Sequence, residues 1–154
     1  MPAPDAAATQ LLRTHGLRST PVRRAVLRRL GAAAAAVSLA DLSAAADADR
    51  ITLYRTLRTF EDLGLIHRVP DVGGDPRYAL CGGACTPEAH AHAHPHFQCG
   101  DCGQTFCLPE VAAAPPVLPQ GYQAREVRVT YEGRCKTCNE GQGGASAKQL
   151  VPAR

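Results

Sequence analysis

The sequence lacks the segments that would place it in or across a membrane. Its N-terminus has neither the basic start nor the leucine-rich apolar run of a secretory leader. No apolar run is long enough to cross a bilayer, since residues 32–36 are five alanines that are only weakly hydrophobic. We therefore expect a cytoplasmic protein that has no membrane partner.

Acidic residues are missing from one arginine-rich stretch near the N-terminus. Six arginines and no aspartate or glutamate lie between residues 13 and 29. Residues 1–80 contain 11 of the 17 basic residues, all of them arginine, against 8 of the 14 acidic ones. Positive charge concentrated on one segment is what a phosphate-contacting surface requires, although a helix face that only meets water would also fit.

A disulfide framework is not expected, because the chain has an odd number of cysteines, seven, and no leader. Four of them form two Cys-x-x-Cys pairs, Cys99/Cys102 and Cys135/Cys138. Two such pairs are what a closed, tetrahedral zinc site needs, and each pair lies on a polar, turn-prone stretch. We predict a structural zinc ion here rather than a catalytic one. Free thiols or disulfides are the alternative.

Residues 1–80 predict a helix-turn-helix followed by a hairpin. We expect helices near 6–15, 21–31, 39–46 and 50–63, with Thr20, Ser38 and Asp49 as N-caps and Gly16 and Gly64 as stops. Strands are expected at 66–69 and 77–80 around a wide turn. The last helix would carry tyrosine and arginine outward, as in a winged helix. A small helical domain with solvated arginines is the alternative.

The remainder predicts short strands at 97, 105–106 and 127–131, with a helical turn at 111–114. From residue 139 onward the Gly/Ser-rich sequence has nothing to bury, so we expect a disordered tail.

Four motifs then resemble the ferric uptake regulator family of bacterial repressors. Residues 17–23, LRSTPVR, are similar to its "LR-x-TP-x-R" opening, and residues 52–57, TLYRTL, to its "TVYRTL" recognition helix. His94-x-His96-x-x-Cys99-x-x-Cys102-Gly103 resembles its "HxHxxCxxCG" segment, and Gly133-x-Cys135-x-x-Cys138 its "GxCxxC". The resemblance covers about residues 10–138.

The resemblance implies an α+β protein with two domains. The N-terminal winged helix-turn-helix domain would span 1–80, a hinge with metal ligands 81–95, a small α/β dimerisation domain 96–138, and the tail 139–154. It also implies a metal-dependent homodimeric repressor of double-stranded DNA with a palindromic operator. Neither an enzymatic activity nor a small-molecule substrate is expected.

The resemblance also implies a second, regulatory metal site. Its ligands would be His94 and His96, with Cys81 and His67 added from the zinc-sensing branch. Three imidazoles and a thiolate make a sound zinc tetrahedron. The long connector contains three further candidate ligands, Cys85, His90 and His92. Two acids, Glu110 and Glu126, remain possible partners.

Zinc is the favoured regulatory ion, with manganese or iron(II) as alternatives. A thiolate ligand favours zinc. Iron and peroxide sensors of the family place a histidine before "V-S", and in this sequence that position is occupied by Ala36. Tyr54 and Arg55 would reach base edges. The other expected DNA-binding residues are Arg18, Arg23, Arg24 and Arg58, which would meet phosphates, and Thr52, which opens the recognition-helix motif.

Two other classes of protein compete with a regulator. A zinc-storage or chaperone protein would use the His-rich stretch but would need no recognition helix. A metalloenzyme would use His-x-His to hold a catalytic ion, yet the sequence shows neither a clear general base nor a nucleophile motif.

Overall fold

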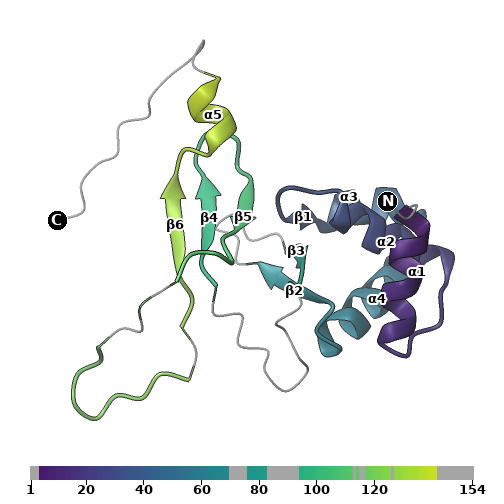
Figure 1. Ribbon diagram of the computed structural model, residues 1–154, viewed down its shortest axis with the longest axis horizontal. Coiled ribbons are helices and arrows are strands. Elements are labelled where there is room, and N and C mark those ends of the chain that lie inside the picture. Colours follow the sequence, from purple (N-terminus) through teal and green to yellow (C-terminus); the bar gives the residue numbers. More distant parts are fainter. Residues whose placement is uncertain are drawn as a thin grey trace.

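The computed structural model describes residues 4–69, 76–82, 94–112, 114, 117–125 and 127–141. A helical N-terminal part lies beside a second part built on an upright sheet (Figure 1). The predicted wing turn at 70–75, the candidate ligands Cys85, His90, His92 and Glu126, and the tail after 141 lie outside the described residues.

Four helices form the N-terminal part: α1 (Pro4–Thr14), α2 (Pro21–Gly31), α3 (Leu39–Ala46) and α4 (Arg50–Asp62). The predicted N-caps are confirmed, because the side chains of Thr20, Ser38 and Asp49 each accept a hydrogen bond from the backbone N–H three residues later. Gly16 and Gly64 have φ of 67° and 71°, as the predicted stops require. Within the described residues, no helix has both the length and the apolar character that a bilayer span needs.

The hydrophobic core lies between these helices and the first sheet. Leu12, Val26, Leu42, Leu53 and Phe60 are each at most 1% exposed. They come from all four helices, so burying one apolar face of each helix fixes the bundle. The outer face of α4 is consequently left exposed.

The first sheet has the strand order β1-β3-β2 and is antiparallel. Its strands are β1 (Val37–Ser38), β2 (Ile66–Val69) and β3 (Arg77–Leu80). The β2–β3 hairpin confirms the predicted pair of strands, and His67 pairs with Ala79 across it. Strand β1 has only two residues, which is too short for a pattern in the sequence to reveal it.

The second sheet has the order β5-β4-β6. It consists of β4 (His96–Cys99), β5 (Thr105–Cys107) and β6 (Thr130–Gly133), followed by α5 (Lys136–Glu140), which stands at one end of the sheet (Figure 1). Strand β4 is antiparallel to β5 and parallel to β6, and His96 pairs with Cys107. The predicted α+β architecture is confirmed.

Three details of the second part differ from the sequence-based expectation. Strand β6 begins at Thr130, and Val127, which was expected in the strand, is 41% exposed and precedes it. The described residues of the predicted helical turn at 111–114, namely 111, 112 and 114, are not helical. A turn lies just before them, where Val111 N–H donates to Leu108 O. Helix α5 continues to Glu140, into the predicted tail.

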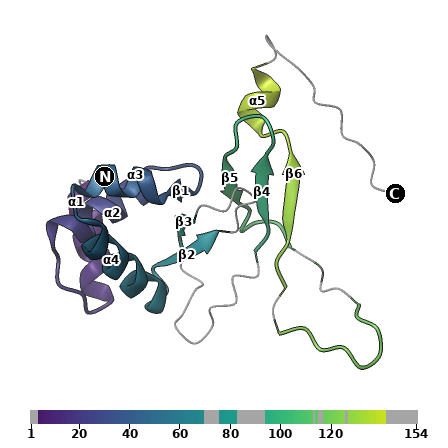
Figure 2. The ribbon, with the colours of Figure 1, turned by 180° about the vertical axis from the view of Figure 1, so that it is seen from behind.

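The two parts meet where β2 points from the helical bundle toward the second sheet, as both views show (Figures 1 and 2). A backbone hydrogen bond crosses the boundary, with Ala36 N–H donating to Thr105 O over 2.7 Å. Thr105 lies on β5, two residues before Cys107. The boundary therefore brings the first sheet close to the strands that carry the histidine motif.

Candidate metal centres and nucleic-acid interface

The four paired cysteines converge at one end of the second sheet. Cys99 ends β4, Cys102 lies on the following turn, Cys135 is the N-cap residue of α5, and Cys138 is within α5. Their sulfur atoms all lie within 4.8 Å of one another. Cys102 Sγ and Cys135 Sγ are 3.9 Å apart. Zn–S bonds of about 2.3 Å in a tetrahedron give sulfur–sulfur distances of about 3.8 Å, so the spacing fits zinc.

Backbone hydrogen bonds favour the thiolate form of Cys99 in this cluster. Hydrogen bonds from the backbone N–H groups of Cys102 and Cys135 lower the pKa of Cys99 to about 6. Gly103 has φ of 68°, which closes the first turn, and its N–H donates to Cys99 O. Arg134 Nε donates to Asp101 Oδ2 over 2.6 Å and ties the loops that carry the two pairs. The cluster is thus arranged to bind a cation through sulfur.

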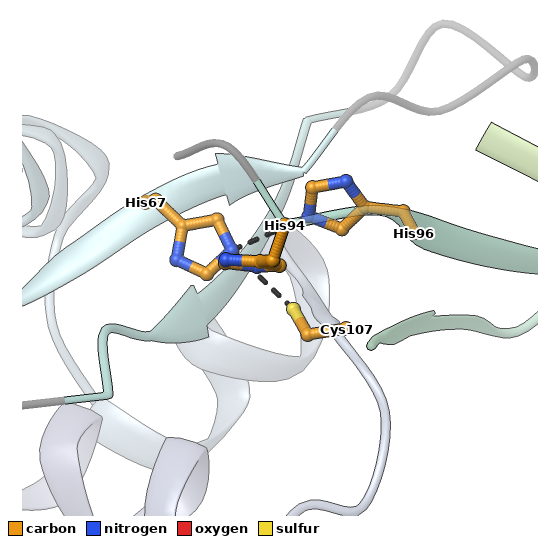
Figure 3. Close-up of side chains that lie close together, drawn as sticks. All are labelled: His67, His94, His96 and Cys107. Atoms are coloured by element: carbon orange, nitrogen blue, oxygen red, sulfur yellow. Dashed lines mark hydrogen bonds between the residues drawn. The ribbon is translucent and has the colours of Figure 1, made fainter. Parts of the chain in front are cut away.

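A second group of donors lies where the two parts of the molecule meet. It consists of His67 on β2, His94 just before β4, His96 on β4 and Cys107 on β5, whose side chains point toward one another (Figure 3). One ligand atom from each lies within 4.8 Å of all the others. His67 Nε2 is 3.5 Å from His96 Nε2 and 3.3 Å from Cys107 Sγ. Tetrahedral zinc spaces two nitrogens about 3.3 Å apart, and a nitrogen and a sulfur about 3.6 Å.

Two members of this second group are buried, and burial shifts the pKa of the other two. His67 is 2% and His96 5% exposed. Burial lowers the pKa of His94, which favours the neutral imidazole that binds metals. Burial also raises the pKa of Cys107 to about 11, so a bound cation must displace a proton from this thiol. Three imidazoles and one sulfur fit zinc.

The structure brings together three of the four predicted regulatory residues and adds one that the sequence reasoning missed. His67, His94 and His96 share the group, but its sulfur comes from Cys107 rather than Cys81. The reason is strand pairing: β4–β5 places Cys107 opposite His96. A hairpin centred on the turn after Cys99 would have predicted this pair. Cys81 Sγ instead lies 3.6 Å from His67 Nδ1, on the other edge of the ring. Glu110 is exposed and belongs to neither donor group.

The outer face of α4 carries the predicted recognition residues. Thr52, Tyr54, Arg55 and Arg58 are all exposed. Thr52 Oγ1 donates to Asp49 Oδ2 over 2.6 Å, so this hydroxyl is already engaged in the helix cap. The guanidinium of Arg50 lies 5.6 Å from the centre of the Tyr54 ring and holds it on the surface. Tyrosine and arginine thus stand together on a free helix face.

The arginines around the start of α2 are more constrained than the sequence suggested. Arg23 Nη1 donates to Arg18 O over 2.9 Å, and Arg24 Nη1 to Ser19 Oγ over 3.0 Å. Arg24 Nε lies 3.9 Å from a carboxylate oxygen of Asp5. Arg23 and Arg24 are half-buried and brace the loop before α2, whereas Arg18 is exposed. Arg18 is therefore the freest of the three to meet a phosphate.

Together, the fold and the sites define a two-domain protein in which a winged helix-turn-helix is joined to a small α/β domain. One cluster suited to a metal ion lies within the α/β domain, and the other lies where the two domains meet. Both clusters consist of side chains from segments distant in the sequence.

Comparisons with known proteins agree with this class. A family model described as a helix-turn-helix domain matches residues 19–69. The peroxide-responsive repressor PerR of Staphylococcus saprophyticus is 25% identical over 138 residues, 84% of this chain and 87% of that protein. A solved zinc uptake regulator complexed with zinc and DNA has a TM-score of 0.58 at 24% identity, covering 88% of this chain and 92% of that one. The Helicobacter pylori ferric uptake regulator has a TM-score of 0.54 at 15% identity, covering 90% and 93%. The resemblance to the ferric uptake regulator family is confirmed, and the chain has the fold of that family's regulators.

Proposed function

We propose that the protein is a metal-responsive transcriptional repressor that binds operator DNA when zinc occupies the group formed by His67, His94, His96 and Cys107. One observation carries this proposal: these donors come from both parts of the molecule, His67 from the winged helix and the others from the second sheet. A site shared in this way couples metal occupancy to the position of the DNA-binding domain.

The donor chemistry supports zinc over manganese or iron(II). Thiolates favour zinc, whereas manganese and iron(II) sites lean toward oxygen ligands, and no carboxylate belongs to this group among the described residues. Solved regulators with this fold include zinc-bound, manganese-bound and iron-bound proteins, so the fold alone does not choose the ion. Ala36, whose small side chain is buried, precedes Val37-Ser38, where the resemblance to the family would place a histidine in iron and peroxide sensors.

The mechanism follows from which residues belong to which domain. His67 is the sole donor that the winged helix contributes to the group, so the domain arrangement that brings it to the other three is the one that metal favours. The bound cation would act as a Lewis acid that holds the four donors in a fixed arrangement. A switch from 1:99 to 99:1 needs about 5.5 kcal/mol of differential binding, which is about a third to a half of the roughly 10–16 kcal/mol that a structural zinc site provides.

The four-cysteine cluster would hold a structural zinc ion, because it is closed and lies within one domain.

Tyr54 and Arg55 would contact base edges, and Arg18 and Arg58 phosphates. A homodimer would place two recognition helices on a palindromic operator. The second sheet has the surface for it, because all four residues of its edge strand β6 are exposed. Two of the exposed large apolar side chains belong to this region, Tyr131 within β6 and Val127 three residues before it.

The decisive experiment is a DNA-binding titration at buffered free zinc, manganese and iron(II), using operator sequences selected from a random library. We expect zinc to activate binding and Cys107→Ser to weaken that response. Arg55→Ala should cost about 1–3 kcal/mol, with relaxed sequence preference, because it removes a base contact.

Arg125→Ala is the matched control, since Arg125 is an exposed arginine that lies in the sequence far from the helical N-terminal part. Binding that needs no metal would refute the proposed regulation. Activation by manganese equal to that by zinc, and unaffected by Cys107→Ser, would refute zinc as the ion. A zinc-storage protein would select no DNA sequence from the random library.

A further inference from the structure

Cys81 lies beside the His67 ring but on the edge opposite to the proposed ion. Its sulfur is 3.6 Å from Nδ1, whereas Nε2 of the same ring faces Cys107 Sγ at 3.3 Å and His96 Nε2 at 3.5 Å. The two nitrogens of an imidazole point in diverging directions. An ion bound through Nε2 therefore leaves Nδ1, and the sulfur beside it, outside the coordination sphere.

We infer that Cys81 is a positioning residue: its sulfur accepts the Nδ1–H hydrogen bond of His67 and so leaves Nε2 unprotonated toward the metal. The inference rests on the proposed function and deepens it, because it separates the two thiols near the site by role. Cys107 is the sulfur ligand, and Cys81 fixes the tautomer of the histidine that joins the domains. Histidines that bind a metal through one ring nitrogen generally donate a hydrogen bond from the other ring N–H, which fixes the tautomer and the orientation of the ring.

The sheet explains why this contact is available before any metal arrives. His67 pairs with Ala79 in the β2–β3 hairpin, and Cys81 lies two residues beyond Ala79, on the same face of the sheet. Cys81 N–H donates to Leu65 O over 3.0 Å, which continues the hairpin pairing to this residue. Both partners are thus held by the β2–β3 hairpin. The ring is oriented there without help from the second sheet.

The experiment uses full-length protein with zinc retained in the four-cysteine cluster, titrated with cobalt(II) at the second site. A cobalt–thiolate bond gives a charge-transfer band that a hydrogen-bonded sulfur does not. We expect this band in wild type, Cys81→Ser and Cys81→Ala, and its loss in Cys107→Ser. Cys81→Ala should weaken cobalt binding by about 10- to 100-fold, and Cys81→Ser should restore most of the affinity because its hydroxyl still accepts a hydrogen bond.

A second readout needs no metal at the site. Nitrogen-15 NMR of the His67 ring should show the Nδ1–H tautomer in wild type and in Cys81→Ser. In Cys81→Ala the ring should shift toward the Nε2–H form.

Three results would overturn the inference: loss of the charge-transfer band in Cys81→Ser, unchanged cobalt affinity in Cys81→Ala, or an unchanged tautomer in that variant. Failure of the proposed function looks different. A wild-type protein whose DNA binding ignores metal would refute the repressor mechanism, while the tautomer measurement would still decide the role of Cys81.

Discussion

Replacing Cys135 with serine should unfold the second domain while the helical domain stays folded. The reason lies in where the core is. Among the described residues, the large cluster of buried apolar side chains runs from Ala8 to Tyr78, all of it in the N-terminal part. In the second part, the buried apolar residues include Cys99 and Cys135, which are themselves members of the four-cysteine cluster. A metal ion bound to this cluster would therefore take the place of a hydrophobic core.

The expected loss of stability follows from a comparison of the zinc-binding free energy with the stability of a whole domain. Structural zinc contributes about 10–16 kcal/mol of apparent binding free energy at pH 7. Whole domains are stable by only about 5–15 kcal/mol. Losing one of the four ligands should remove more zinc-binding free energy than the net stability of the second domain, because little buried apolar area remains to compensate.

Amide hydrogen exchange followed by NMR measures the two domains separately. In Cys135→Ser, protection should be lost across β4, β5 and β6 and retained in α4. Lys136→Ser is the matched control, since its side chain is 84% exposed and its ion pair with Glu140 is long, at 3.8 Å. If Cys135→Ser, shown by mass spectrometry to be zinc-free, keeps wild-type protection in β4, the reasoning is refuted.

Three further predictions concern the helical domain. Phe60→Ala should lower the free energy of unfolding in urea by about 3–5 kcal/mol because the ring is fully buried, whereas Ile51→Ala, at a position 64% exposed, should change it little. Asp5→Asn should cost less than about 1 kcal/mol, since its ion pairs with α2 are exposed, yet it should raise DNA affinity and steepen the salt dependence by releasing arginines. Hydrogen bonds from the side chain and then the backbone of Thr52 lower the pKa of Asp49, so its stabilising effect is present above its ordinary pKa of 3.8 and is lost on acidification below it. Thermal melts of Asp49→Asn from pH 7 to pH 2 should accordingly lack that part of the acid destabilisation.

Local signals in the sequence were sufficient for the helices and for one metal cluster. The caps at Thr20, Ser38 and Asp49 depend on residues three positions away, so single-sequence reasoning located them. The four-cysteine cluster was also predictable, because each Cys-x-x-Cys pair is local and only the joining of the two pairs is not.

The second donor group was only partly predictable, because it depends on strand pairing. Whether Cys81 or Cys107 joins the histidines is decided by which residue lies opposite His96 and by which edge of His67 faces the ion. Both are tertiary facts that the resemblance to a family could not supply for this chain. The two-residue strand β1 was missed for a related reason, since its existence depends on β3.

The hydrogen bond from Ala36 N–H to Thr105 O limits how sharply the protein can switch. It joins the two domains through backbone atoms alone, so metal does not have to be present for it to form. A hydrogen bond of this kind contributes about 0.5–1.5 kcal/mol, which biases a domain equilibrium by about 2- to 12-fold. The metal-free protein would then visit its DNA-binding arrangement often enough to leave residual repression under zinc starvation. Ala36→Pro, which leaves no N–H to donate, should remove this residual repression.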